Sequence, residues 1–194
     1  MNRDPIASPP TSAYDWKMDV RALLAQGLRQ EHLKIGECIF TTKDLLIVTV
    51  LGSCVSVTFH HAGGAAAMFH AMLPDSAQAS GPLRHPCNFA DLAVEAILER
   101  FRAKGLDLRE IKTRLFGGGN TFCAEERDHI AEMLDVGRKN VAAARAALKR
   151  HGLTPLSEDV LGARGRKVLF HTGSGTTWVR GVDAAPDDDF ICQD

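Results

Sequence analysis

Residues 48–57, Val-Thr-Val-Leu-Gly-Ser-Cys-Val-Ser-Val, contain a cysteine between two apolar runs. Two apolar, β-prone runs flank a Gly-Ser pair, so we expect a tight turn there with Cys54 at its edge. A third apolar run, residues 65–72, carries His70. Nearly continuous apolar runs are typical of strands that are covered on both faces. The pattern therefore predicts a buried sheet that brings a thiol and an imidazole to its edge.

The rest of the chain adds helices at irregular intervals. A weak amphipathic helix is expected over residues 17–30, and packing on the domain is favoured over an extension with its own partner. The elements expected after residue 74 are a helix from an N-cap at Asn88 to Gly105, a strand over Ile111–Phe116, a helix over Arg138–Arg150, and a hairpin of Arg166–His171 with Thr176–Val182. Because this order lacks regular βαβ alternation, we predict an α+β fold in which helices cover mixed sheets.

Composition divides the chain into three parts and is typical of a globular protein. Residues 1–32 are the expected N-terminal extension, a proline-rich tail with a short helix; residues 33–183 are the domain, and residues 184–194 are an acidic tail. Hydrophobic residues make up 45% of the chain and charged residues 24%, which is ordinary. The formal net charge of -1 provides no positive field for nucleic acid or an anionic membrane. A protein or a small molecule is the expected partner.

The five cysteines, at positions 38, 54, 87, 123 and 192, are an odd number without a Cys-x-x-Cys pair. This is a poor disulfide framework, and it favours a reducing compartment in which most cysteines are small buried hydrophobes. No apolar run approaches the roughly 20 residues that span a bilayer. The first fifteen residues lack the apolar core of a signal peptide. We therefore expect a cytoplasmic protein that is not embedded in a membrane.

Cys54 and His70 are the candidate catalytic residues. A cysteine attacks as a thiolate, which a neighbouring imidazole helps to form, and an attacked carboxamide needs backbone amides for its oxyanion. Gly52 and Ser53 belong to the turn that would direct such amides. The local pattern also accommodates a buried, inert cysteine and a hydrogen-bonded core histidine.

A third side chain is needed to orient the imidazole. Thr49, Ser76 and Asp75 are all close in sequence to the candidate pair. A carboxylate stabilises an imidazolium best, so chemistry alone prefers Asp75.

Neither a metal nor a cofactor is expected. No pair among the cysteine and the three histidines of residues 54–70 has the spacing of a known zinc motif. The Gly-Gly-Gly run at 117–119 lacks both the Lys-Ser/Thr of a phosphate loop and the dinucleotide fingerprint. A turn that lets the end of a strand pack closely is the expected role of these glycines.

Several blocks, in a fixed order, resemble one protein family. They are Thr-Val-Leu-Gly-Ser-Cys-Val-Ser-Val at 49–57, Met-Phe-His-Ala-Met-Leu-Pro-Asp-Ser at 68–76, Asn-Phe-Ala-Asp-Leu-Ala-Val at 88–94, Gly-Gly-Gly-Asn-Thr-Phe at 117–122, Val-Gly-Arg-Lys-Asn-Val at 136–141, and Ser-Glu-Asp-Val-Leu-Gly-Ala-Arg-Gly-Arg-Lys-Val-Leu-Phe-His-Thr-Gly at 157–173. Over residues 33–182 the chain resembles the chemoreceptor glutamine deamidases of bacterial chemotaxis, the CheD family.

The resemblance implies hydrolysis of particular receptor glutamines to glutamates with release of ammonia, and also demethylation of receptor methyl-glutamates. The family's nucleophile falls on Cys54, its base on His70 and its third member on Thr49, which takes the place of Asp75. The implied fold is two mixed sheets packed together with helices on the outer faces (α/β/β/α), similar to the catalytic domain of cytotoxic necrotizing factor toxins. The N-terminal thirty residues have no counterpart in the resemblance, and a glycine stands third in the glycine block, where an alanine is common.

The expected function is therefore that of a cysteine-dependent protein-glutamine glutaminase acting on the cytoplasmic domain of methyl-accepting chemoreceptors. Members of this family also associate with CheC-type chemotaxis phosphatases, so a regulatory binding partner with little catalysis of its own is the alternative. A cysteine hydrolase acting on another amide or on a peptidoglycan fragment is a third hypothesis.

Overall fold

The computed structural model describes residues 16–78, 85–119 and 131–182. The helices are α1 (Trp16–Ala25), α2 (Ala90–Ala103) and α3 (Ala131–Arg150), with short 3-10 helices η1 (Ser76–Gln78), η2 (Pro86–Asn88) and η3 (Leu108–Glu110). The strands are β1 (Arg29–His32), β2 (Cys38–Thr41), β3 (Leu45–Leu51), β4 (Val55–His61), β5 (Ala65–Phe69), β6 (Ile111–Gly117), β7 (Ser157–Val160), β8 (Gly165–His171) and β9 (Thr177–Val182). Among these described residues, no helix is long and apolar enough to cross a bilayer.

The strands form two mixed sheets. The first has the order β1-β3-β8-β9 and the second β2-β5-β4-β6-β7. One pair in each sheet is parallel, β1 with β3 and β6 with β7, and the other pairs are antiparallel. The predicted α+β fold with mixed sheets is confirmed. Strand β5 is buried along its whole length, as expected for an apolar run that is covered on both faces.

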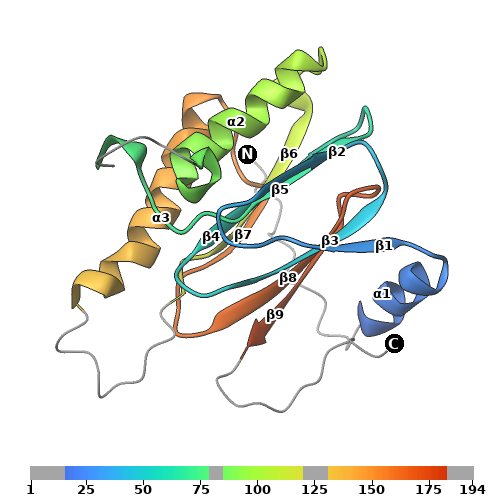
Figure 1. The fold of residues 1–194 in the computed structure, drawn as a ribbon, viewed down its shortest axis with the longest axis horizontal. Helices are drawn as coiled ribbons and strands as arrows, with labels where there is room; N and C mark the ends of the chain where they lie inside the picture. The colour runs from blue at the N-terminus through green and yellow to red at the C-terminus, as the bar shows by residue number, and fades with distance from the viewer. Residues whose placement is uncertain (1–15, 79–84, 120–130, 183–194) are drawn as a thin grey trace, which may run out of the picture.

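The two sheets pack face to face, and helices cover both outer surfaces (Figure 1). The cluster between the sheets contains Ile47 and Leu51 from β3 and Met68 from β5. Helices α2 and α3 lie against the outer face of the second sheet, whose side chains form a separate cluster with theirs. Fully buried Val20 of α1 packs on the outer face of the first sheet. The layers are therefore α/β/β/α, as predicted.

The N-terminal segment is built into this arrangement. Helix α1 packs on the domain as predicted, but it ends at Ala25, and the chain turns at Gly27, which has a φ of 85°. Residues 29–32, which the sequence assigned to the extension, form β1 beside β3. Their sequence, Arg-Gln-Glu-His, lacks the apolar alternation that reveals a strand. Pairing with an already buried neighbour decides their conformation.

Two helix boundaries differ from the prediction. Asn88 does not cap α2, because it lies in η2 and Phe89 occupies the N-cap position. Helix α3 already covers residues 131–137, before its predicted start near 138. The predicted end of α2 is confirmed, since Gly105 adopts a φ of 71° that favours glycine. The predicted hairpin is confirmed as the antiparallel pair β8 and β9.

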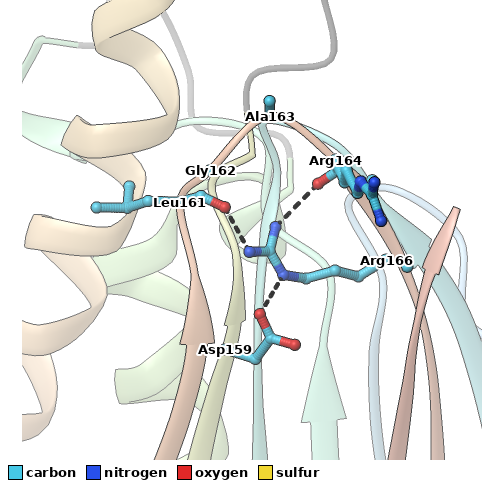
Figure 2. A pocket seen from close by; sticks show the side chains of 8 residues that line it. Asp159, Leu161, Gly162, Ala163, Arg164 and Arg166 are labelled. Carbon is cyan, nitrogen blue, oxygen red and sulfur yellow. Dashed lines mark hydrogen bonds and ion pairs between the residues drawn. The ribbon is translucent and has the colours of Figure 1, made fainter. Parts of the chain in front are cut away.

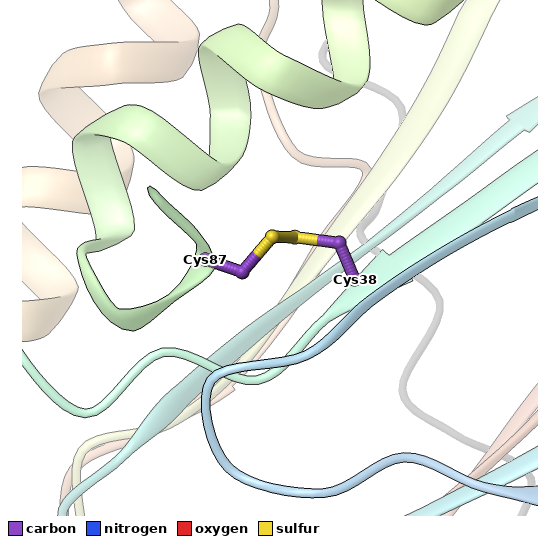
Figure 3. The surroundings of a disulfide bond; sticks show 2 residues. All are labelled: Cys38 and Cys87. Atoms are coloured by element: carbon purple, nitrogen blue, oxygen red, sulfur yellow. A yellow bond between two sulfur atoms is a disulfide. The ribbon is translucent and has the colours of Figure 1, made fainter. Parts of the chain in front are cut away.

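The prediction that the cysteines are unpaired is wrong for two of them. Cys38 at the start of β2 and Cys87 in η2 form a disulfide, with Cα atoms 5.9 Å apart (Figure 3). The two residues are separated by 49 positions, so only the packing of η2 against the second sheet brings them together. Cys54 is the free cysteine of the described residues. Cys123 and Cys192 lie outside the described ranges.

Candidate active site

Cys54 lies in the connection between the two sheets. Strand β3 of the first sheet ends at Leu51 and β4 of the second begins at Val55, so the intervening turn crosses from one sheet to the other. The amide of Gly118 donates to the carbonyl of Cys54 at 2.8 Å. Gly117 has a φ of 106°, and a Cβ there would lie 2.1 Å from that same carbonyl oxygen. The glycine run therefore allows β6 to pack closely against the Cys54 turn, as the sequence predicted.

His70 follows β5 directly and is almost completely buried, with 3% of its surface exposed. Its amide donates to the carbonyl of Glu37 at 3.0 Å, and its carbonyl accepts from the amide of Gly36 at 2.7 Å. Both backbone groups of His70 are thus fixed by the segment that precedes β2. The imidazole has a rigid support.

The backbone places Cys54 and His70 on one face of the second sheet. Val55 and Ala71 pair as an antiparallel bridge, and both belong to or border the cluster under the helices. Side chains alternate between faces along a strand, so the residues before each of them point the other way, toward the first sheet. Cys54 does pack against the cluster between the sheets. The two candidate residues are therefore diagonal neighbours across this bridge.

Thr49 of β3 faces the same space from the first sheet. Its hydroxyl oxygen lies 2.8 Å from Nδ1 of His70 and donates to the carbonyl of Leu33, also at 2.8 Å. A carbonyl can only accept, so the single hydroxyl proton of Thr49 is committed to Leu33. The imidazole must then donate from Nδ1 to Thr49, which leaves Nε2 with its lone pair. Nε2 is buried and has no hydrogen-bond partner within the described ranges.

The other two candidates for orienting the imidazole are engaged elsewhere. Asp75 is exposed, and its carboxylate accepts from the amide of Ala77 at 2.6 Å. Ser76 donates its hydroxyl proton to Asp91 at 2.8 Å. The structure therefore brings Thr49 to His70 and leaves Asp75 and Ser76 in the turn before α2. We refer to Thr49, His70 and Cys54 together as the His70 site.

Burial acts on both titratable groups of the His70 site. Burial raises the pKa of the Cys54 thiol, and the amide of the same residue lowers it by a smaller amount. Burial lowers the pKa of His70, opposed by the carbonyl of Leu33 and the charge of Glu37. Both shifts favour the neutral forms. Burial thus opposes an ion pair between the Cys54 thiolate and the His70 imidazolium.

The turn also contains amides that can receive a developing negative charge. Within the described part of the chain, the amides of Ser53 and Cys54 donate to no backbone carbonyl. The carbonyl of Gly52, in contrast, accepts from the amide of Gly119 at 2.8 Å. The carbonyls of the turn are thus held from behind while two amides are left without backbone partners. These two amides are therefore available to an oxyanion.

Comparison with known proteins identifies the family. The family model described as CheD chemotactic sensory transduction matches residues 72–181. A protein of Nitratidesulfovibrio vulgaris, named probable chemoreceptor glutamine deamidase CheD, is 44% identical over 92% of this chain and 85% of its own length. One of the same name from Oleidesulfovibrio alaskensis is 48% identical over 82% of this chain and 76% of its own. The chain belongs to the CheD family.

The extent of these matches differs. The CheD family model begins two residues after His70, whereas the alignment with the Nitratidesulfovibrio protein takes in 183 residues. Among solved structures, the hypothetical protein YfiH of Bacillus licheniformis is 13% identical with a TM-score of 0.41, over 65% of this chain and 51% of that one.

Asn140 of α3 belongs to the site and was not singled out from the sequence of this CheD-family chain. Its Nδ2 donates to the carbonyl of Ser53 at 2.9 Å and to that of Met72 at 3.1 Å. A usable signal exists: Asn140 precedes Ala144 and Leu148 at spacings of four, on the apolar stripe of the helix. A polar residue on such a stripe needs a buried partner.

A cavity of about 350 Å³ lies elsewhere, between the β7–β8 loop and β9 (Figure 2). The guanidinium of Arg166 donates there to Asp159 at 2.7 Å and to the carbonyls of Leu161 and Arg164. Its charge is therefore used to fasten the loop. Within the described ranges, His, Cys, Asp and Glu side chains form no group of three or more that could hold a metal ion.

Proposed function

We propose that this protein is a chemoreceptor glutamine deamidase, which hydrolyses the side-chain amide of receptor glutamines to glutamate and releases ammonia. The names of its relatives support the substrate class. The observation that carries the chemistry is the contact of Thr49 with Nδ1 of His70, because it leaves Nε2 bare on the face that also carries Cys54. A buried lone pair near a thiol is the requirement for a general base.

The proposed reaction proceeds by acyl transfer in two halves. Nε2 of His70 takes the thiol proton as the sulfur of Cys54 attacks the carboxamide carbon. The amides of Ser53 and Cys54 hold the oxyanion of the tetrahedral intermediate. The imidazolium then returns its proton to the departing nitrogen, so ammonia leaves and a thioester forms. Water, deprotonated by His70, attacks the thioester, and the products are glutamate and the free thiol.

Thr49 acts through His70 in this scheme. By accepting a hydrogen bond from Nδ1–H, Thr49 keeps the tautomer whose Nε2 is a base, and it accepts a stronger hydrogen bond when the ring becomes positive. A hydroxyl stabilises the imidazolium less than the carboxylate of Asp75 would. Burial also lowers the pKa of His70, which favours the neutral ring that can accept a proton.

The substrate is proposed to be a glutamine on the cytoplasmic region of a chemoreceptor, and the site of action the cytoplasm. Large exposed apolar side chains lie close in sequence to all parts of the His70 site: Ile35, Val50, Met72 and Leu73, between 37% and 55% exposed. Exposed apolar groups of this kind are typical of surfaces that bind another protein. A net charge of -1 gives no support for nucleic acid as a partner.

The test is deamidation of a receptor cytoplasmic fragment by the wild type and by Cys54→Ala. The wild type should release ammonia and raise the mass of the fragment by one dalton per glutamine, and Cys54→Ala should do neither. Ser174→Ala, a change in the β8–β9 turn, is the matched control and should match the wild type. Undiminished deamidation by Cys54→Ala would refute the assignment.

Binding to a CheC-type phosphatase is the second part of the proposal, because the same exposed apolar residues offer a docking surface. Two variants distinguish the catalytic role from the binding role. If a folded Cys54→Ala variant sustains normal adaptation and Met72→Asp abolishes it, regulation by binding is the main function. If Cys54→Ala abolishes adaptation, catalysis is the main function.

A further inference from the structure

Asn140 joins two segments that carry the proposed catalytic pair. It is completely buried, and its two Nδ2 bonds end on Ser53, directly before the nucleophile, and on Met72, two residues after the base. The Cys54 turn connects the sheets, whereas Met72 continues the line of β5. One side chain of an outer helix therefore fixes both segments from behind.

The orientation of this amide group follows from its partners. Both are carbonyl oxygens, which only accept, so the NH2 group must face them and Oδ1 must point away. Oδ1 is buried and has no hydrogen-bond partner among the described residues. Burying an unsatisfied carbonyl is destabilising. The two donated bonds are thus formed at a cost that an apolar residue at this position would avoid.

The bond to Ser53 also determines the direction of the Cys54 amide. The carbonyl of Ser53 and the N–H of Cys54 belong to one planar trans peptide unit, in which they point in opposite directions. A donor that holds the carbonyl toward α3 therefore turns the N–H away from α3. This N–H is one of the two amides without a backbone partner in the described part of the chain.

We propose that Asn140 is a positioning residue that sets the Ser53–Cys54 peptide so that the Cys54 amide serves the oxyanion, and that keeps the Cys54 turn in place relative to the His70 strand. The part that concerns the oxyanion rests on the proposed function. The part that concerns the position of the turn does not.

The decisive comparison uses Asn140→Asp and Asn140→Ala against Leu148→Ala. The aspartate keeps the shape of the side chain but presents oxygens to two carbonyls, and the alanine removes the group. Leu148 is fully buried on the same helix, so its truncation destabilises the fold while leaving both Asn140 bonds in place. All three are assayed at a temperature at which circular dichroism shows them folded.

Both Asn140 variants should lower kcat for receptor deamidation by about 100-fold, as expected when one oxyanion donor is lost, and should change KM by less than about threefold. Leu148→Ala should keep kcat within about threefold of the wild type. If either Asn140 variant retains the kcat of the wild type, or if Leu148→Ala loses as much as they do, the oxyanion role is overturned.

A measurement without substrate separates this inference from the proposed function. In hydrogen–deuterium exchange, the amides of Gly118 and Gly119, which donate to the carbonyls of Cys54 and Gly52, should exchange at least about tenfold faster in Asn140→Asp than in Leu148→Ala. Equal exchange would overturn the positional role, even in an active enzyme. If the wild type deamidates no receptor but this difference in exchange is found, the proposed function fails and the positional role stands.

Discussion

Two histidines in the described part of the chain each have Nδ1 2.8 Å from a hydroxyl oxygen, but the surroundings of their Nε2 atoms differ. One is in the His70 site. The other is in what we call the His171 turn, formed by Asp44, His171 and Ser174, where Nδ1 lies 2.8 Å from the serine hydroxyl. The carboxylate of Asp44 lies 2.7 Å from Nε2 of His171. By residue type alone, the His171 turn matches a hydrolytic triad better than the His70 site does.

The difference lies in what each nitrogen and hydroxyl is already doing. In the His171 turn Nδ1 contacts Ser174, and Nε2 has the carboxylate of Asp44 within ion-pair distance, although Nε2 makes no hydrogen bond among the described residues. Ser174 donates its proton to Thr176 at 2.7 Å and accepts the Thr176 amide at 3.2 Å. These contacts fasten the connection between β8 and β9. In the His70 site, Nε2 is buried and has neither a hydrogen-bond partner nor an ion-pair partner among the described residues, and a thiol lies on the same face. A base is recognised by an unsatisfied lone pair on a rigid support, and the residue trio alone does not identify it.

The largest expected effect comes from exchanging each histidine for glutamine. His70→Gln should lower kcat by about 1,000-fold, because it removes the base for both halves of the reaction. His171→Gln should remain within about threefold of the wild type, because it loses contacts of a turn. Ammonia release at saturating receptor fragment measures both. A comparable loss in the two variants would erase the distinction between the regions.

Removing the hydroxyl of Thr49 or that of Ser174 should give the next largest difference in kcat. Thr49→Val keeps the shape of the side chain but removes the acceptor for Nδ1, and losing a buried hydrogen bond of about 1.5 kcal/mol should lower kcat about tenfold. Thr49→Ser keeps a hydroxyl and should therefore retain most of the wild-type kcat. Ser174→Ala should leave kcat unchanged. If Thr49→Val is fully active while folded, Thr49 does not orient the base.

The pH profile provides a smaller and more specific test. Burial holds the pKa of His70 below the 6.5 of an ordinary imidazole, and the base must be neutral. As the pH falls, kcat/KM should therefore stay level through 6.5 and drop about tenfold per unit only below the lowered pKa. The unfolded chain takes up this proton first, so folding stability also falls as the pH drops below 6.5. His171→Gln should leave the acid limb unmoved, and a limb centred above 6.5 would contradict the assignment.

Removing the disulfide is expected to have the smallest effect on activity. The bond lies beside segments that hold the His70 site. Cys38 follows Glu37, which holds the His70 amide, and Cys87 precedes Asn88, whose carbonyl accepts the amides of Met72 and Leu73. Replacing both cysteines by serine should lower the free energy of unfolding by about 2–4 kcal/mol and change kcat by less than about threefold.

Urea unfolding with and without dithiothreitol measures this effect. Reductant should destabilise the wild type and leave the double variant unchanged. A wild type whose unfolding midpoint ignores the reductant would show that the bond does not form in solution.

Local pattern was sufficient for the elements that bury apolar faces. Strands β3 to β5, the β8–β9 hairpin and the amphipathic parts of α2 and α3 were all visible as apolar periodicity, because burial of each face leaves a repeating trace in the chain. The short parallel strands β1 and β7, Arg-Gln-Glu-His and Ser-Glu-Asp-Val, left no such trace. Their partners in the sheet determine them.

For the site, the sequence by itself determined which residues have reactive groups and the family to which the ordered blocks belong. Cys54 and His70 could be named because each ends or borders a buried run. The family resemblance implied Thr49 in place of Asp75, but only the tertiary structure shows that the Thr49 hydroxyl meets the imidazole and that Asn140 holds the Ser53 carbonyl. The physical reason is that a hydrogen bond across two sheets or from an outer helix depends on which faces meet, and that choice is made by packing.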